Sequence, residues 1–540
     1  MKHKGIIFAL TFMFTFALLS CATPGSIQVE SKWLDATATE QLVAMENGLL
    51  TSETLVSGYL ARIERLDKNG PMLNSVLSLN PHALADAKAL DDMRAKGELK
   101  GPLHGVVVLL KDNIESKELP TTAGSLALLN NHTYRDSPLV SQLRNAGAVI
   151  LGKTNLSEWA NFRSEKSSSG WSAVGGLTRN PHMLNRTACG SSSGSGVAIA
   201  AGLASLAVGT ETNGSIICPS SMNGIVGFKP TVGLVSRSHI VPISPTQDTA
   251  GPMVRSVEDA ALMVSVMAGV DPADPVTTYT NRPDSNTLAQ SAISLADLRV
   301  GVVRWRQGED ADIIQLFDKT VTALNAAGAT VVEISEHTQP DDFWKQSYFV
   351  LLAEFKTALN QYLLQSPASL PVSNLSELIG FNNTSVREMA LFDQSIFLLS
   401  DNTQGMNDDN YAGALKTVRA ATRENGIDAL LTRNNVDVLI APSNNPAFLI
   451  DAVYGDNAPN GYVGIGYMAA IAGYPHLTLP MGAVRDLPVG LSIIGGQWDD
   501  ARVLAVGKSV QAILPSRIIP VFYTTRFDAP SLNKAAEPYK

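Results

Sequence analysis

The chain has 540 residues, of which 45% are hydrophobic and 17% are charged, and its formal net charge is −9. This composition supports a large buried core and excludes a disordered or tail-like protein. Acidic and basic residues are mixed along the chain, and no basic run with interleaved aromatic residues is present. We therefore expect no nucleic-acid partner.

The N-terminus differs in composition from the rest of the chain. Lys2 and Lys4 precede an apolar run from Ile6 to Leu19, and the last two residues of the run with Ser20 and Cys21 form the sequence LLSC. This pattern is typical of a secretory signal, and the run is short for a bilayer-spanning helix, which needs about 20 apolar residues. LLSC also resembles the bacterial lipobox, in which the cysteine is lipidated. We expect an exported lipoprotein of the cell envelope, held on a membrane by lipid on Cys21. A signal that is simply cleaved, or an uncleaved anchor, is the alternative.

The domain prediction has four parts. We expect residues 1–20 to be a lipoprotein signal peptide, residues 21–40 an N-terminal tether, residues 41–525 one large domain and residues 526–540 a C-terminal tail. No internal repeat or long low-complexity linker divides the third part, so a single large domain is expected.

Strand and helix patterns alternate along this domain, which favours an α/β layered fold. Strands are predicted where β-branched and apolar residues run together between turn signals. In chain order we expect a strand at Gly105–Leu110 with Lys111 at its end, a helix at Pro138–Ala146, a strand at Ala148–Leu151, a closely packed helix in Val197–Leu206, a strand at Leu298–Arg304, a helix from Ala311 to about Ala327, and strands at Thr330–Ile334, Asp437–Ala441, Leu477–Pro480 and Gly490–Ile494. Residues 341–425 are expected to form a helical cover over the sheet.

A glycine-serine stretch, GSSSGSG at 190–196, contains a possible catalytic pattern. Gly190–Gly194 fits G-x-S-x-G, the nucleophile elbow of α/β-hydrolases. That mechanism needs a histidine later in the chain. His239, His337 and His476 are the candidates, and none of them lies in a further hydrolase pattern.

A second pattern, Gly147–Thr154 (GAVILGKT), fits the phosphate-binding loop G-x-x-x-x-G-K-[ST]. Such a loop must curl so that successive backbone amides face one anion. The four middle residues are Ala, Val, Ile and Leu, which prefer an extended strand. The sequence therefore argues against a nucleotide site here.

The stretch Gly209–Pro219 (GTETNGSIICP) predicts a tight turn that could direct several amides at one point. Such amides stabilise an oxyanion, and a serine at the end of the turn could attack a carbonyl held there. Serine needs a base. Because no histidine lies nearby in the sequence, lysine is the candidate.

Three separated segments resemble one family, the amidase-signature hydrolases. Pro102–Ile114 resembles the lysine segment of that family, Cys189–Gly196 its glycine-serine loop, and Gly209–Thr231 its nucleophile segment. Ser191 and Ser215 are 24 residues apart, as the two catalytic serines of the family typically are. Later segments agree as well: DTAGPM at 248–253, AGYPHLTLPMG at 472–482 and LPVGLSIIG at 487–495.

The resemblance implies an amidase-signature fold of class α/β, a mixed central β-sheet flanked by α-helices on both faces. It implies a catalytic triad of Ser215 as nucleophile, Ser191 as proton relay after a cis peptide bond, and Lys111 as base. The oxyanion would lie among the backbone amides of Thr212, Asn213, Gly214 and Ser215. A free lysine has a pKa near 10.4, so only about one in 2500 is neutral at pH 7, and burial is expected to favour the neutral form.

Other residues in the matching segments are expected to be structural. His104 lies in a Pro-Leu-His-Gly turn, Lys153 in GKTN and Lys229 in FKPT. If Cys21 carries lipid, Cys189 and Cys218 remain, and the sequence leaves open whether they form a disulfide or stay as thiols. The histidines and cysteines show no ligand spacing, so we expect no metal and no cofactor.

The substrate prediction follows from the same resemblance. GTETNGSIICP and the segment after it are most similar to bacterial peptide amidases, which release ammonia from the C-terminal carboxamide of peptides; these typically carry aspartate where this chain has Asn213. We expect a small-molecule or short-peptide amide substrate and no obligatory protein partner. The alternatives are a general amidase for small aliphatic or aryl amides, the amidase subunit of a tRNA-dependent transamidase, and an inactive ligand-binding lipoprotein.

Overall fold

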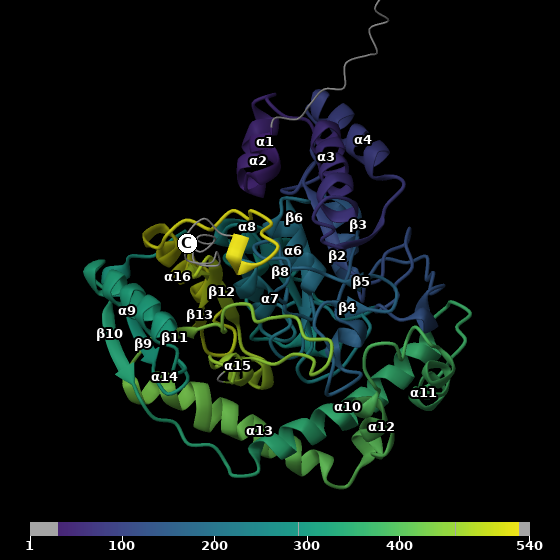
Figure 1. Ribbon diagram of the computed structural model, residues 1–540. Coiled ribbons are helices and arrows are strands. Elements are labelled where there is room, and N and C mark those ends of the chain that lie inside the picture. The colour runs from purple at the N-terminus through teal and green to yellow at the C-terminus, as the bar shows by residue number, and fades with distance from the viewer. Residues whose placement is uncertain (1–30, 290, 460, 529–540) are drawn as a thin grey trace, which may run out of the picture.

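Eleven strands of the described chain form one mixed sheet at the centre of the molecule (Figure 1). The computed structural model describes residues 31–289, 291–459 and 461–528. The order across the sheet is β1 (Val76–Leu79), β3 (Val149–Thr154), β2 (Val107–Lys111), β6 (Leu206–Glu211), β8 (Thr249–Val254), β7 (Val226–Lys229), β12 (His476–Val484), β13 (Leu487–Ile494), β11 (Val438–Pro442), β9 (Arg299–Val303) and β10 (Thr330–Ile334). A separate pair, β4 (Trp171–Ser172) and β5 (Gly176–Leu177), forms a small two-stranded sheet.

Parallel and antiparallel pairs both occur in the large sheet. Strand β2 runs parallel to β3 and β6, and β9 runs parallel to β10 and β11. The strands between these two groups pair antiparallel, from β6·β8 across to β13·β11. The predicted mixed sheet is therefore confirmed.

Four helices cover one face of the sheet. Every second side chain of a strand points to the same face, and on this face these side chains are apolar and pack against the helices. Leu110 of β2, Leu477 of β12 and Leu491 of β13 belong to one apolar core with the side chains of these helices. The helices are α5 (Pro138–Asn145), α8 (Val257–Met267), α9 (Ala311–Ala326) and α16 (Asp500–Ile513).

The opposite face carries four helices, two of which follow the glycine-serine stretches. Side chains of Val107 and Leu109 pack on this face together with helix α6. Lys111 follows them at the same period of two, so its side chain leaves β2 toward this face. The helices here are α6 (Ser193–Ala200), α7 (Ile217–Met222), α14 (Asp428–Asn434) and α15 (Gly466–Ala472).

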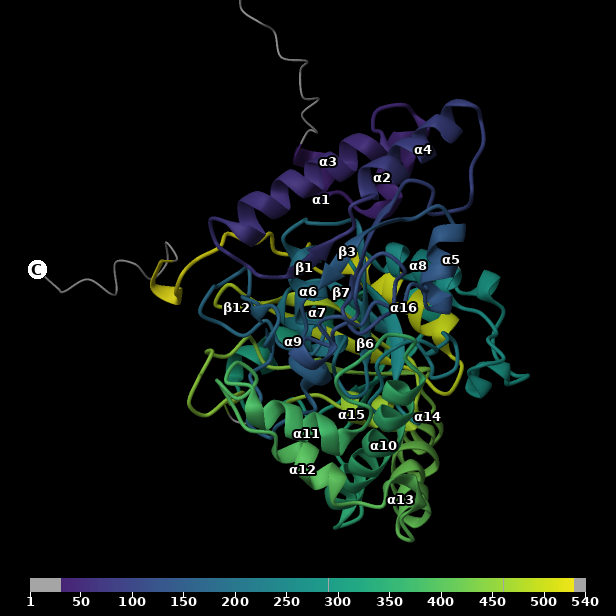
Figure 2. The same ribbon diagram turned by 90° about the vertical axis from the view of Figure 1, so that its right-hand side faces the viewer.

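Helices lie at two opposite ends of the molecule (Figures 1 and 2). One end has α1 (Ser31–Asp35), α2 (Ala38–Glu46), α3 (Ser52–Arg62) and α4 (Ala83–Ala95), and the other has α10 (Phe343–Gln365), α11 (Leu375–Thr384), α12 (Ser395–Asp401) and α13 (Tyr411–Thr422). The second group is the helical region predicted at residues 341–425. Its apolar core contains loop residues such as Trp159 and Val241 and, among the described residues, none from the large sheet, so these helices cover loops at one end of the molecule and not a face of the sheet as predicted (Figure 1). Buried Arg163 fastens the second group to the sheet region, with Nη1 2.5 Å from Glu158 and 3.1 Å from Glu388. No helix within the described ranges is long and apolar enough to cross a membrane.

The structure differs from the predicted elements at a few boundaries. The packed helix expected in Val197–Leu206 is α6, which begins at Ser193 and ends at Ala200, and Leu206 already belongs to β6. The second half of the predicted tether is folded, since α1 and the start of α2 lie within it and Ala38 is buried. The predicted signal peptide and Cys21 lie outside the described residues.

Candidate active site

Lys111 ends a strand whose residues are all buried. Its Nζ lies 2.7 Å from Oγ of Ser191, 2.8 Å from Oγ1 of Thr210 and 3.2 Å from the Thr210 carbonyl oxygen. Asn113 donates from Nδ2 to the same threonine hydroxyl at 3.0 Å. The lysine is thus surrounded by hydroxyl and carbonyl oxygens, and it makes no ion pair among the described residues.

Burial changes the charge preference of this lysine. The side chain is 0% exposed, and loss of hydration lowers the pKa of Lys111 to about 7. The carboxylates of Asp248 and Glu211 act in the opposite direction and raise the pKa, but they do not touch the ammonium group. About half of the molecules therefore carry a neutral amine at pH 7, and a neutral amine can accept a proton.

The loop that presents Ser191 is shaped by a glycine and a cis peptide bond. The bond between Gly190 and Ser191 is cis, as the resemblance implied. A Cβ on Gly190 would come within 2.1 Å of Oγ of Ser157, so another residue fits there only if that hydroxyl, which accepts the Gly170 amide, is displaced. The amide of Ser157 also donates to the Ser191 carbonyl at 3.0 Å. These contacts hold the Ser191 hydroxyl against Lys111.

The nucleophile segment is a turn between β6 and α7. Gly214 has φ of 80°, in the left-handed region that glycine adopts without strain. After the turn, Oε2 of Glu211 accepts the amides of Ile216 at 2.7 Å and Ile217 at 3.0 Å. The carboxylate thus fixes the first amides of α7, which have no partner inside the helix.

The four backbone amides that precede Ile216 are available to donate hydrogen bonds to a ligand. Among the hydrogen bonds of the described residues, none is donated by the backbone amides from Thr212 to Ser215. Ser215 is 8% exposed, and its carbonyl accepts the amide of Ser192 at 3.1 Å, which joins the two serine segments. The hydrogen bonds within the described ranges include none between the hydroxyls of Ser215 and Ser191. The turn can thus offer several amide donors to one oxygen.

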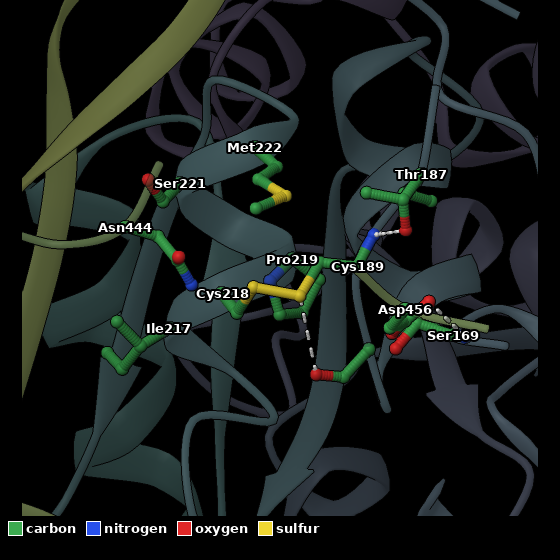
Figure 3. Close-up of a disulfide and its surroundings, with 12 residues drawn as sticks. Ser169, Thr187, Cys189, Ile217, Cys218, Pro219, Ser221, Met222, Asn444 and Asp456 are labelled. Atoms are coloured by element: carbon green, nitrogen blue, oxygen red, sulfur yellow. Dashed lines mark hydrogen bonds between the residues drawn. A yellow bond between two sulfur atoms is a disulfide. The ribbon is translucent and has the colours of Figure 1, made fainter. Parts of the chain in front are cut away.

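A disulfide between Cys189 and Cys218 links the same two segments (Figure 3). Their Cα atoms are 5.9 Å apart, and both cysteines are largely buried. Cys189 precedes Ser191 by two residues and Cys218 follows Ser215 by three. The sequence left this pairing open, and the structure shows the bond.

A cavity of about 540 Å³ lies against the disulfide and the nucleophile turn. Gly190, Asn213 and Gly214 line it on the side of the catalytic segments. The wall also contains four aromatic side chains and one group of each charge: Trp344, Phe448, Tyr462, Tyr467, Arg306 and Asp456. Figure 3 draws Asp456 and Asn444 around the disulfide. The cavity has the size of a small-molecule site, and polar and apolar groups share its surface.

The two alternative motifs have other roles. Ser192, the serine of G-x-S-x-G, donates its hydroxyl to the Thr210 carbonyl at 3.0 Å and makes no histidine contact among the described residues. The GAVILGKT segment forms β3 in extended conformation and offers no curled loop of amides. The structure therefore supports neither a nucleophile elbow nor a phosphate-binding loop.

The residues expected to be structural are held by backbone groups. Nδ1 of His104 accepts the Lys100 amide at 3.0 Å, and Nε2 lies 2.9 Å from the Leu90 carbonyl. Lys153 donates to the Ile114 carbonyl at 2.6 Å and Lys229 to the Pro230 carbonyl at 3.0 Å. These contacts fix turns and strand ends.

The sequence did not single out two neighbours of the site. Thr210 contacts Lys111 because β6 lies beside β2, and Glu211 anchors α7 because the chain turns back toward its own strand. Both residues stand in the GTETNGS segment, so the resemblance marked the segment without indicating these contacts.

Known proteins resemble this chain over nearly its whole length. The Amidase family profile matches residues 54–504. A putative amidase of Schizosaccharomyces pombe is 35% identical over 520 residues, 91% of this chain and 87% of that protein. A glutamyl-tRNA(Gln) amidotransferase subunit of Coxiella burnetii is 34% identical over 478 residues, 86% of this chain and 94% of that protein. The X-ray structure of native peptide amidase from Stenotrophomonas maltophilia has a TM-score of 0.85 at 43% identity, covering 90% of this chain and 98% of that chain.

Proposed function

This chain belongs to the amidase family and is an amide-hydrolysing enzyme, and we propose that Ser215, Ser191 and Lys111 are its catalytic triad. The observation that carries the proposal is the 2.7 Å contact between the buried, readily neutral Lys111 amine and the Ser191 hydroxyl. The backbone contact from Ser192 to Ser215 supports the same grouping, because it holds the nucleophile turn next to the relay serine.

The mechanism follows from the direction in which protons can move. Neutral Lys111 accepts the proton of Ser191 while Ser191 accepts that of Ser215, and Ser215 Oγ attacks the amide carbonyl carbon. The carbonyl oxygen becomes an oxyanion and is bound by the open amides of the turn. The proton then returns through Ser191 to the leaving nitrogen, and the C–N bond breaks to give ammonia and an acyl-serine. Water cleaves the acyl-serine through the same relay.

We place the substrate among peptides with a C-terminal carboxamide. The aromatic side chains of the cavity suit an acyl group larger than acetyl, and the S. maltophilia enzyme named as a peptide amidase is a structural relative. Asn213 is exposed at the edge of this cavity, at the position where peptide amidases typically carry aspartate. A general amidase for small amides would use the same triad, so the preferred substrate distinguishes a peptide amidase from a general amidase.

The cellular location is a further part of the proposal. The LLSC sequence ending at Cys21 and the two lysines before the apolar run support export and lipidation of that cysteine. An exported enzyme without tRNA or partner subunits is expected to differ from the amidotransferase subunits that it also resembles. Labelling of the full-length protein with a radioactive fatty acid in a bacterial host, lost in Cys21→Ala, tests this part.

The test of the proposed function is ammonia release by protein lacking residues 1–21. The substrates are a C-terminally amidated dipeptide, acetamide and benzamide, with Ser215→Ala as the blank. Release mainly from the peptide amide, absent in the variant, supports a peptide amidase. Release only from the simple amides contradicts the peptide assignment and retains the triad. Full activity in Ser215→Ala contradicts the triad.

A matched pair of variants tests the histidine alternative. We expect His239→Asn and His337→Asn to keep kcat/KM within about twofold of the unaltered enzyme, because neither ring hydrogen-bonds to Lys111, Ser191 or Ser215 within the described ranges. A loss comparable to that of Ser215→Ala would instead favour an α/β-hydrolase mechanism.

A further inference from the structure

A chain of buried hydroxyl groups ends at Ser443 in the wall of the cavity. Nε2 of His476 lies 2.6 Å from Oγ of Ser492, and Ser492 donates to Oγ of Ser443 at 2.9 Å. Oγ1 of Thr478 lies 2.7 Å from the same Ser443 oxygen. Ser443 and its neighbour Asn444 line the cavity, and Asn444 appears beside the disulfide residues in Figure 3.

The strand register brings these residues together. Thr478 of β12 and Ser492 of β13 are direct cross-strand partners, and Ala441 of β11 lies opposite Ser492 on the other side. Ser443 directly follows β11, two residues after Ala441, and its amide donates to the Gly490 carbonyl at 2.8 Å. All of these side chains point to the sheet face that also carries Lys111, since the alternate residues of the same strands enter the opposite core.

The histidine at the far end of the chain is a donor and not a base. It is fully buried, and burial lowers the pKa of His476 to about 3, so the ring is neutral. Ser492 has one proton, which it gives to Ser443, so its oxygen must accept the proton on Nε2 of His476. Nδ1 then carries the lone pair, and it has no hydrogen-bond partner among the described residues.

The Ser443 proton can serve a ligand in the cavity. Ser443 accepts a hydrogen bond from Ser492, and its 2.7 Å contact with Thr478 allows either hydroxyl to be the donor. When a ligand places an acceptor opposite Ser443, the Thr478 hydroxyl turns to donate to Ser443, and Ser443 donates its proton to the ligand. A buried donor at a cavity wall selects ligands that place an acceptor opposite it.

We propose that Ser443 is a specificity-determining residue that donates a hydrogen bond to a backbone carbonyl oxygen in the acyl part of the substrate. This inference rests on the proposed function and adds the reason why a peptide amide is preferred to a simple amide. His476 and Ser492 are positioning residues that act through Ser443.

The test compares two amides that differ by one peptide bond. N-acetyl-phenylalaninamide has the carbonyl oxygen, and 2-benzylpentanamide replaces the acetamido group by a propyl chain of similar length. We expect Ser443→Ala to lower kcat/KM for the first compound about tenfold, mainly through KM, because one hydrogen bond is lost. Hydrolysis of the second compound should change little, so the ratio of the two rates falls about tenfold.

Two further variants separate a specific role from a general loss of stability. Ser492→Ala should lower the same ratio in the same direction, because Ser443 loses the donor that orients it. Ser221→Ala is the matched control: Ser221 is buried in α7 and accepts the Gly490 amide at 2.9 Å, outside the chain that ends at Ser443. We expect the ratio in this control to equal that of the unaltered enzyme.

The outcomes are distinct. An equal loss for both amides in Ser443→Ala, or no loss for either, would overturn the inference. An unchanged ratio in Ser492→Ala would overturn the part assigned to His476 and Ser492. Failure of the unaltered enzyme to hydrolyse either amide would contradict the proposed function itself, and the inference with it.

Discussion

Lys111 makes the pH dependence of the enzyme predictable. Because the pKa of Lys111 is lowered to about 7, about half of the enzyme has the neutral base at pH 7 and only about 1% at pH 5. We expect kcat/KM to fall about fiftyfold between these two values and to level off above about pH 8. The assay is ammonia release at substrate concentrations well below KM, from pH 5 to pH 10.

The carboxylate of Asp248 near Lys111 provides a second test of the pH profile. Asp248 raises the pKa of Lys111 by attraction and is held by Oγ1 of Thr212 at 2.6 Å and by the amides of Ile243 and Ser244, both at 2.8 Å. Asp248→Asn keeps the shape of the side chain, and removing the charge should shift the midpoint of the profile to lower pH. Glu333→Gln on the exposed strand β10 is the control and should leave the midpoint unchanged.

Two results would refute this reasoning. A rate that continues to rise tenfold per pH unit up to pH 10 would mean that the base has the pKa of an exposed lysine, near 10.4. A flat profile from pH 5 would mean that Lys111 does not accept the proton.

Three other predictions concern the framework around the triad. Gly190→Ala should abolish activity and destabilise the fold by about 1–3 kcal/mol, because the added Cβ would lie 2.1 Å from the Ser157 hydroxyl. Ammonia release measures the first effect and thermal unfolding the second, and near-normal activity would contradict the tight fit. Arg163→Met should lower the free energy of unfolding by about 3–5 kcal/mol, since Glu158 and Glu388 would be left buried without a counter-charge. An unchanged midpoint in a urea titration would contradict this, and Arg502→Met, at the exposed ion pair with Asp437, is the control. The double change of Cys189→Ala and Cys218→Ala should lower the free energy of unfolding by about 3.6 kcal/mol, because the bond closes a loop with a sequence separation of 29. Equal urea midpoints for both proteins would contradict this prediction.

The elements that the sequence predicted are those with a local signal. The runs of β2, β9 and β10 appear within two residues of their predicted ends. β2 and β9 are almost wholly buried, as continuous apolar runs in a sheet usually are, whereas β10 has only Ile334 buried. β12 was predicted to end at Pro480, yet it continues to Val484 past a proline that cannot donate to a neighbouring strand. The structure accommodates the proline through a register shift between Pro480 and Gly482.

In the candidate site, too, the sequence indicated the residues that have a local signal and missed the contacts that depend on strand pairing. The resemblance indicated Lys111 and Ser191, and the structure brings them within hydrogen-bond distance. Neither the contact of Thr210 with the lysine nor the hydroxyl chain that ends at Ser443 has a local signal. Both depend on which strands are neighbours and on their register, and such long-range pairing is not contained in the pattern of a single segment.

Covalent labelling tests the identity of the nucleophile most directly. The protein lacking residues 1–21 would be treated with a fluorophosphonate, which reacts with activated serine hydroxyls, and the modified peptide would be identified by mass spectrometry. We predict one adduct on Ser215, formed at least 100-fold more slowly in Lys111→Met because the base is missing. An adduct on Ser192 or Ser443, or equal labelling of the Lys111→Met protein, would contradict the proposed triad.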